Sequence, residues 1–416
     1  MTTAWIREPG FRDFLAARTV SWAGNVMSLV AMPVLVYQRT SSATLTGLLA
    51  ALEALPYLVL GLPAGALADR WNNRRVMTWT SILAGATMLT IPAAHLAGIL
   101  TVPQIFAVAL TVGIAFVFSD ASAFGALPVL VGRDRIGSAM ATMTAINTVL
   151  SIAGPGIAGV LIASVGAPWV VAIDGVAYAI AALLLARMPW DPGAIEKSDA
   201  PTSLRAEIAE GLAFVWAHPV IRQLTFMGIG LSVTGGAVAG LTVVLAVEQL
   251  GFADDDGRLG LLYVAASIGA FLGSVALGWL QRNWTVGAVT VIGYAAVSLL
   301  TIALGATTSW VLAAAVMIGF NLVSTVVILN GIVVRQTLTP MRLQSRVNTT
   351  ARMIAWGGSP AGAAIGGVLA GAWGVDVAFF VCAGSTAVAL AVGLFTRVRL
   401  IGRLASLTDA VPAETR

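Results

Sequence analysis

The stretch GALADRWNNRR, residues 65–75, decides the fold, because it places one acid and three arginines within eleven positions of a very apolar chain. Hydrophobic residues make up 58% of the 416 residues, and charged residues only 10%. The mean hydropathy is +0.91. This composition is typical of a protein that crosses a membrane many times rather than of a soluble domain. The charged stretch is therefore expected in a short loop between two membrane spans.

Twelve apolar segments are expected to cross the membrane. A bilayer core about 30 Å thick requires about 20 apolar residues in each helical span. Glycine, proline and charged residues divide the chain into twelve such segments, near residues 12–37, 44–68, 76–97, 103–125, 139–164, 169–188, 220–247, 259–281, 286–305, 309–333, 347–371 and 375–396. The apolar runs are continuous and do not alternate with polar residues, which favours helices over strands. The predicted fold class is an all-α membrane protein.

The basic residues indicate how the spans are oriented. Positive charge is retained on the cytoplasmic side during insertion, and nearly all of the 23 basic residues, Arg335 among them, fall in connections on the side shared by both termini. Only Arg39 and Arg258 fall opposite. Both termini are therefore expected in the cytoplasm. The preference for Arg over Lys indicates a bacterial protein, hence a bacterial inner membrane, and basic charge that recurs at every second loop does not form a nucleic-acid-binding face.

The longest polar interruption, residues 189–219, divides the chain into two halves. Residues 1–188 are predicted to form an N-terminal six-helix bundle, and residues 220–416 a C-terminal six-helix bundle with a cytoplasmic tail. Apolar residues recur at helical spacing within the linker, at Leu204, Ile208, Leu212 and Val215. This pattern predicts an amphipathic helix along the membrane surface. Weak sequence similarity between the halves indicates pseudo-symmetric bundles, as expected of a transporter built from repeats.

With its position fixed between spans 2 and 3, GALADRWNNRR resembles the signature of the major facilitator superfamily, roughly G-x-L-A-D-R-x-G-R-R. Gly65, Asp69, Arg70 and Arg74 match, whereas Asn72 and Asn73 stand where the family has Gly and Arg. The resemblance implies a twelve-span secondary transporter that works by alternating access, with this motif as a cytoplasmic gate. In such a gate the Asp69 carboxylate lies against a helix N-terminus, and the arginines hydrogen-bond facing loops or lipid phosphates.

Other stretches resemble one branch of that family, the group with enterobactin-type siderophore exporters and macrolide efflux pumps. Among them are ALPYLVLGLPAGALADRW and GALPVLVGRDRI. Asn25 occupies a first-span position where that group often carries Asp. Gly154, Pro155 and Gly159 resemble a fifth-span motif associated with drug–proton antiporters, although tight helix packing alone would equally explain three such residues.

Ionisable side chains within the spans are costly, so each is a functional hypothesis. Glu53 is expected to take up a proton from outside and release it inward; the alternative is a side chain that reaches the outer interface or hydrogen-bonds a neighbouring span. Asp120 and Arg352 are expected at similar depths and could form an inner latch between the halves, with Arg18 or solvent as competing partners of Asp120. Asp174 and Asp376 are expected to be wetted residues at the outer mouth.

The lining of the transport cavity is predicted from adaptable methionines and from flat aromatic or amide side chains, which suit bulky amphiphilic ligands. The candidates are Trp22, Asn25, Met32, Tyr37, Phe116, Asn147, Met227, Asn321 and Trp356.

The predicted function is proton-coupled export of an amphiphilic organic molecule, such as a drug or antibiotic. The proton gradient supplies the energy, so neither a cofactor nor a metal is expected, and the protein is expected to work as a monomer among membrane lipids. Alternatives are an exporter of siderophores or specialised metabolites and a nutrient symporter. A receptor or a membrane enzyme is an alternative of another class, but no nucleotide-binding motif and no catalytic cluster at membrane depth supports an enzyme.

Overall fold

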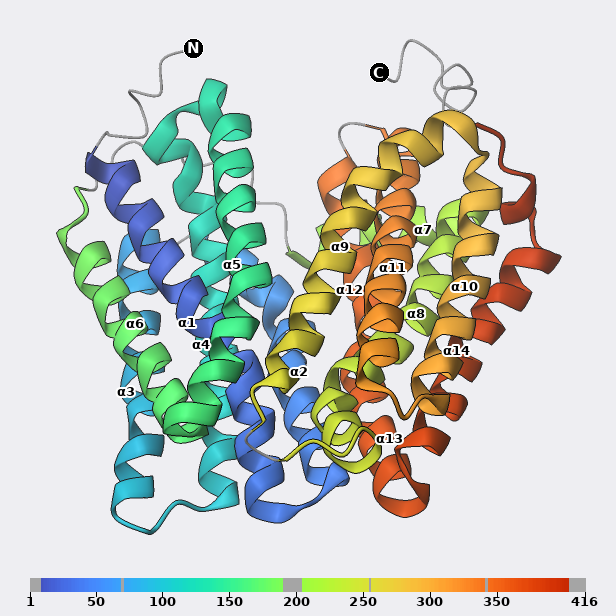
Figure 1. Ribbon diagram of the computed structural model, residues 1–416. Helices are drawn as coiled ribbons and strands as arrows, with labels where there is room; N and C mark the ends of the chain where they lie inside the picture. Colours follow the sequence, from blue (N-terminus) through green and yellow to red (C-terminus); the bar gives the residue numbers. More distant parts are fainter. Residues whose placement is uncertain (1–8, 69–70, 190–203, 254–255, 341–342, 404–416) are drawn as a thin grey trace. The chain divides into compact units, whose positions relative to one another are not determined.

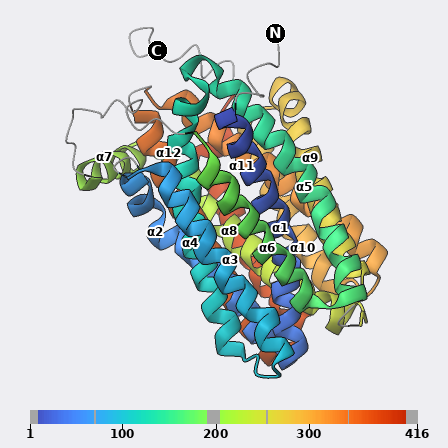
Figure 2. The same cartoon turned by 90° about the vertical axis from the view of Figure 1, so that its left-hand side faces the viewer.

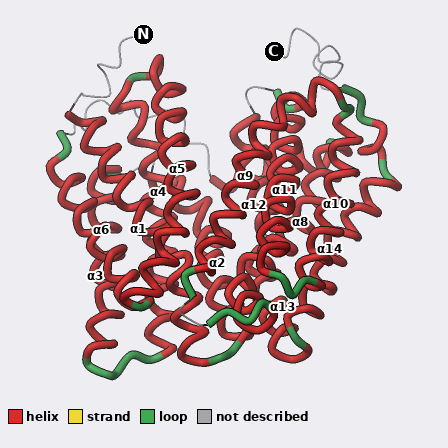
Figure 3. The backbone as a smooth tube through the Cα atoms, viewed as in Figure 1, coloured by secondary structure: helices red, strands yellow, loops and turns green. Residues whose placement is uncertain are grey.

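The computed structural model describes residues 9–68, 71–189, 204–253, 256–340 and 343–403. Within these ranges it contains helices and loops and no strand (Figure 3). Twelve helical stretches among the described residues are long and apolar enough to cross a membrane. The prediction of an all-α fold is therefore confirmed.

Six long helices come before the linker (Figure 1). They are α1 (Pro9–Thr40), α2 (Ala43–Ala68), α3 (Asn73–Leu96), α4 (Val102–Val131), α5 (Ile136–Val165) and α6 (Ala167–Arg187). The helix predicted in the linker is α7 (Leu204–Ala217). The helices that follow are α8 (Pro219–Val244), α9 (Arg258–Asn283), α10 (Val286–Ala306), α11 (Trp310–Leu338), α12 (Gln344–Trp356), α13 (Gly358–Trp373) and α14 (Val375–Phe395), with a π-helical turn, Leu245–Gln249, at the end of α8.

The segment predicted as one span at 347–371 is confirmed as one candidate span, Thr350–Trp373, although the helix is interrupted at Gly357, between Trp356 and Gly358. Two consecutive glycines, Gly357 and Gly358, weaken the helix at this point. Pro360 follows, and it lacks the backbone N–H that would continue the ladder. The break sets α12 and α13 as separate helices, with Trp356 at the end of the first.

By its internal contacts the chain divides into two compact units. The first unit comprises Met1–Ser41, Leu52–Ala200 and Phe252–Val264; the second comprises Ser42–Ala51, Pro201–Gly251 and Ala265–Arg416. The predicted division places its boundaries at residues 188 and 220. The units differ from it because the start of α2 belongs to the second unit and the start of α9 belongs to the first. Small residues explain both cases: Gly47 lies against the backbone of Gly367, and Gly260 lies against that of Gly159.

In the first unit, α6 packs between α1 and α3 (Figure 2), while α4 packs on α3 and α5 packs on α1. Phe11, Phe14, Met77, Leu127 and Leu185 belong to one hydrophobic cluster of this unit. In the second unit, α8 packs on α13 and α14, and α10 packs on α11 and α14. The contact of α8 with α13 is so close that a Cβ added to Gly362 would overlap the carbonyl oxygen of Val233.

Candidate functional site: buried acids of the first unit

Asp174, about two turns into α6, is fully buried. Neither of its carboxylate oxygens has a hydrogen-bond partner among the described residues. It fits against α1 because position 24 is glycine: a Cβ there would overlap Asp174 Oδ1. Ser28 of α1 interacts with the carboxylate electrostatically, but its hydroxyl lies outside hydrogen-bond geometry. The prediction of a wetted mouth residue is therefore wrong for Asp174, because α1 covers this face of α6; Asp376, by contrast, is exposed.

Arg18 of α1 forms an ion pair with Asp120 of α4, with Arg18 Nη2 donating to Asp120 Oδ1 at 2.9 Å. The Arg18 guanidinium also lies 4.5 Å from the centroid of the Trp22 ring. Only 7% of Arg18 is exposed, and a charge so far from water needs such a partner. In the structure, Asp120 thus pairs with Arg18, the competing partner predicted from the sequence, and the latch with Arg352 stays a prediction.

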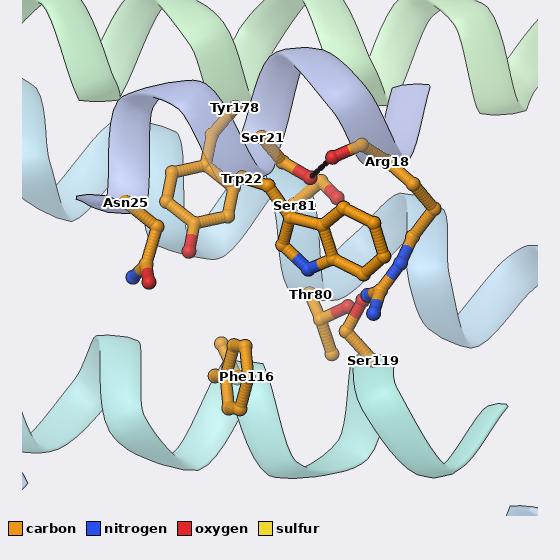
Figure 4. Close-up of a pocket in the computed structure, with 10 residues that line it drawn as sticks. Arg18, Ser21, Trp22, Asn25, Thr80, Ser81, Phe116, Ser119 and Tyr178 are labelled. Carbon is orange, nitrogen blue, oxygen red and sulfur yellow. Dashed lines mark hydrogen bonds between the residues drawn. The ribbon is translucent and has the colours of Figure 1, made fainter. Parts of the chain in front are cut away.

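Tyr178, one turn after Asp174 on α6, connects this ion pair with the buried acid. It interacts electrostatically with Asp174 and Arg18, and it lies close to the Asn25 side chain. Figure 4 shows Arg18, Trp22, Asn25, Tyr178 and Phe116 gathered around a small pocket. The space in it is about 20 Å³, close to that of a single water molecule.

Glu53 of α2 lines a second and larger cavity, of about 180 Å³. Asn25, Ser28, Met32, Met88 and Phe116 line it as well. Asn25 and Phe116 border both pockets, and Ser28 lies between the larger one and Asp174. Tyr263 of α9 is an electrostatic neighbour of Glu53. The structure therefore brings together Glu53, Asn25, Met32 and Phe116 from the predicted set, and it places Trp22 at the adjoining pocket.

The remaining candidates for the cavity lining lie elsewhere. Tyr37 and Met227 are buried in helix packing, and Asn147 is exposed on α5. The Asn321 amide donates to the Met317 carbonyl of its own helix. Trp356 lines a cavity of the second unit that Arg352 also lines.

Part of the predicted gate motif can be located. Asp69 and Arg70 lie outside the described residues, and Gly65 has open space where a Cβ would be. Arg74 donates through Nε to the Leu185 carbonyl at 3.2 Å and through Nη2 to the Ala186 carbonyl at 2.5 Å. These carbonyls lie at the C-terminal end of α6, where the last carbonyl groups lack intrahelical partners. A cation there supplies the missing donor and also interacts favourably with the negative end of the helix dipole. Arg74 therefore ties the start of α3 to the end of α6.

The fifth-span motif is a surface for close helix packing. A Cβ on Gly154 would lie 2.7 Å from the Val26 side chain of α1. One on Gly159 would lie 2.5 Å from the Gly257 carbonyl oxygen, just before α9. The carbonyl oxygen of Pro155 lies against Gly260. The packing interpretation accounts for these contacts, and the antiporter-specific role stays a prediction.

Sequence reasoning missed Asp174, Tyr178 and Arg335 as site residues. Asp174 stands in the apolar run WVVAIDGVAYAIA, and its distance from Gly166, which precedes α6, would have placed it about two turns into the membrane. Arg335 was assigned to a cytoplasmic connection because the preceding span was ended at residue 333, whereas α11 continues to Leu338. Nothing in one sequence indicates that the two side chains are buried.

Comparison with known proteins identifies the fold and the relatives. The family model described as Major Facilitator Superfamily matches residues 14–354. The multidrug efflux pump Tap of Mycolicibacterium fortuitum is 29% identical over 375 residues, which are 88% of this chain and 90% of the pump. The enterobactin exporter EntS of Salmonella choleraesuis is 26% identical over 299 residues, 71% of this chain and 70% of the exporter.

A solved structure has the same fold. It is a bacterial homolog of the human lysosomal transporter Spinster, in an inward-facing and unoccupied conformation, and it superposes with a TM-score of 0.77 at 14% identity. The superposition covers 95% of this chain and 98% of the other. The predicted resemblance to this family, and to a branch with efflux pumps and siderophore exporters, is confirmed.

Proposed function

Because the chain belongs to the major facilitator superfamily of transporters, we propose that it exports amphiphilic organic molecules in exchange for protons, by alternating access. It does so as a monomer in the bacterial inner membrane, with both termini in the cytoplasm and without a bound cofactor. The proposal extends the family assignment by a direction of transport, an energy source and a substrate class.

The observation that carries the proposal is the environment of Asp174. An ionised carboxylate without hydrogen-bond donors or an ion pair is very costly in an apolar interior. The site as built therefore fits the neutral acid. Water or a donor must reach the carboxylate before it can release its proton, and helix movement in a transport cycle would provide that access. Asp174 thus alternates between a covered, protonated state and a wetted, ionised one.

Glu53 is the second proton-carrying candidate, and its setting differs from that of Asp174. It borders a cavity of about 180 Å³ that is large enough for several waters. Ser28 and Asn25 lie between it and the Asp174 region, so waters in the cavity could pass a proton from one acid to the other. In this scheme Glu53 exchanges protons with the cavity and Asp174 holds the proton where water is excluded.

The relatives support export. The pump Tap is named for multidrug efflux, and it aligns with most of this chain. The similarity to the enterobactin exporter EntS supports a second candidate, export of a siderophore or another specialised metabolite. Both candidates share an amphiphilic cargo that leaves the cell, and they differ only in its identity.

The test uses everted membrane vesicles that contain the protein and hold a pH gradient. Macrolides, tetracyclines, cationic dyes and catecholate siderophores are added one at a time, and gradient collapse is recorded relative to empty vesicles. The variants are Asp174→Asn and Glu53→Gln. Their matched controls are Asp376→Asn and Glu248→Gln, which change exposed acids in α14 and at the end of α8.

We expect one substrate class to collapse the gradient in the wild type and in both control variants, and Asp174→Asn to lose this response at least tenfold. Glu53→Gln is expected to weaken it. Gradient collapse that is the same in Asp174→Asn as in the wild type would contradict the role of this acid. Substrate efflux without any proton movement would contradict proton coupling itself.

A further inference from the structure

The second unit contains a buried arginine that the proposed proton path does not use. Arg335, in the last turn of α11, is only 7% exposed. Its Nε has no hydrogen-bond partner among the described residues. Tyr294 of α10 interacts with it electrostatically, but a neutral phenol does not balance a positive charge. A guanidinium in such a position is costly unless a negative group completes its surroundings.

Arg335 lines a cavity of about 70 Å³ together with Arg352 and Trp356 of α12. The Arg352 guanidinium lies 5.9 Å from the Trp356 ring centroid. The hydroxyl-bearing residues Ser232 and Tyr294 also line the cavity, and the described residues that line it include no acid. Two guanidinium groups thus border one cavity without a carboxylate among its described walls.

We propose that this cavity of the second unit binds an oxyanion, a phosphate or carboxylate group, between Arg335 and Arg352. The planar guanidinium offers paired N–H donors whose spacing matches the oxygens of such groups. Ser232 and Tyr294 supply hydroxyl donors at its sides. Trp356 provides a flat apolar wall for the organic part of the ligand.

The size of the cavity limits what enters it. A water molecule occupies about 30 Å³ in the liquid, so about 70 Å³ holds one head group and not a whole drug-sized molecule. The rest of the ligand must therefore extend out along Trp356, which is 48% exposed. This arrangement suits an amphiphile with an anionic head, either a transported molecule or an anionic lipid. For a transported molecule, the inference rests on the proposed export function and narrows the substrates to amphiphilic anions.

The test measures ligand binding in the absence of a pH gradient. A negative result for the oxyanion site can therefore be distinguished from a negative result for proton-coupled export. The full chain is placed in nanodiscs of phosphatidylcholine, which carry no net charge. Phenyl phosphate and benzoate are titrated calorimetrically, with benzyl alcohol as the uncharged control. The variants are Arg335→Gln and Arg352→Gln, and the matched control is Arg282→Gln, which changes an exposed arginine of α9 in the same unit.

We expect phenyl phosphate to bind the wild type and Arg282→Gln equally, and the dissociation constant to rise at least tenfold in Arg335→Gln. Arg335→Lys keeps the charge without the paired donors, so it should weaken binding less than Arg335→Gln. Thermal unfolding midpoints establish that each variant is folded. If Arg335→Gln does not fold, Arg352→Gln replaces it as the test of the site. Failure of phenyl phosphate to bind the wild type, or binding in both glutamine variants that is as tight as in the wild type, would overturn the proposal.

A second set of nanodiscs distinguishes the two sources of the oxyanion. When phosphatidylglycerol replaces part of the phosphatidylcholine, a lipid head group that occupies the cavity will compete with phenyl phosphate in the wild type. Weaker phenyl phosphate binding therefore assigns the site to an anionic lipid. Unchanged binding assigns it to a transported anion, and both results support an oxyanion site that depends on Arg335.

Discussion

The two units differ in the charge that they bury. The first unit encloses Asp174 without a hydrogen-bond partner and the Arg18–Asp120 ion pair, and Glu53 borders its larger cavity. In the second unit, Glu248 and Asp376, the acids of its described spans, are exposed, and the buried charge is that of Arg335. Under the two proposals above, this difference gives similar bundles different tasks, proton exchange in the first unit and recognition of a negative group in the second.

Several neutral polar side chains of the second unit hydrogen-bond across helices, although others, such as Ser324 and Thr339, have a buried hydroxyl without a partner among the described residues. The Thr234 hydroxyl contacts Ser385 Oγ at 2.8 Å, and Ser298 Oγ donates to Thr386 Oγ1 at 2.9 Å. The Asn330 amide donates to Thr290 Oγ1 at 3.2 Å. Such bonds fix helices against one another without any change of protonation. We infer that these bonds and the close glycine contacts make the second unit rigid, and the predictions below test this inference.

The two largest expected effects are of similar size, and the first comes from Gly236→Ala in α8. A Cβ at this position would overlap the Ser359 carbonyl oxygen of α13, which is backbone and cannot rotate away. Separating the two helices should cost about 3 kcal/mol of unfolding free energy, measured by thermal or denaturant unfolding in detergent. Gly235→Ala is the control, because open space surrounds that position. Equal stability of the two variants would contradict close backbone packing as the basis of rigidity in the second unit.

In the first unit, Arg18 and Asp120 should each stabilise the folded protein only when the other is present. Arg18→Gln leaves a largely buried carboxylate without its partner, which should cost about 3 kcal/mol of unfolding free energy. The double variant Arg18→Gln/Asp120→Asn should recover about 2 kcal/mol relative to the sum of the single variants. The control cycle uses Arg12 and Asp13, whose ion pair includes an arginine side chain that is 63% exposed. Additive effects in the first cycle would show that the pair is not coupled.

Much of the fold was predictable from the sequence, because continuous apolar runs specify helices and basic loops separate them. The break at Gly357 was not predicted, since a Gly-Gly pair is tolerated in many membrane helices. The acids were harder to interpret. Glu53 was singled out because it is an acid deep in a span. Asp174 was misjudged because its burial depends on Gly24, 150 positions earlier in the chain, which lets α1 approach α6. Contacts of that kind are set by tertiary packing and leave no local pattern.

A smaller effect is expected from the hydroxyl network of the second unit. Thr234→Val removes the hydrogen bond to the Cys382 carbonyl, 2.9 Å long, and the contact with Ser385. Interhelical hydrogen bonds in membranes contribute about 0.6 kcal/mol on average, so a loss of about 1 kcal/mol is expected for the two contacts together. Thr301→Val is the control, because that buried hydroxyl donates only within its own helix, to Val297. A larger loss in the control would argue against interhelical bonds as the source of rigidity.

The smallest expected effect concerns pH, and it lies outside the spans of the second unit. Burial lowers the pKa of the His218 imidazole below its ordinary 6.5. In the folded protein its Nδ1 accepts from the Ile221 N–H at the start of α8. The imidazole therefore binds a proton more readily in the unfolded chain than in the folded protein. The stability contributed by the neutral imidazole is fully present above about pH 6.5 and falls as the pH drops towards the lowered pKa.

His218→Asn should remove this pH dependence, because asparagine caps a helix equally well and does not titrate. We expect amide hydrogen exchange in the first turn of α8, corrected for intrinsic rates, to accelerate in the wild type between about pH 7.5 and pH 5.5. The variant should show no such change. The same acceleration in both proteins would show that a group other than His218 is responsible, and it would contradict the role of this imidazole as the pH-dependent cap of α8.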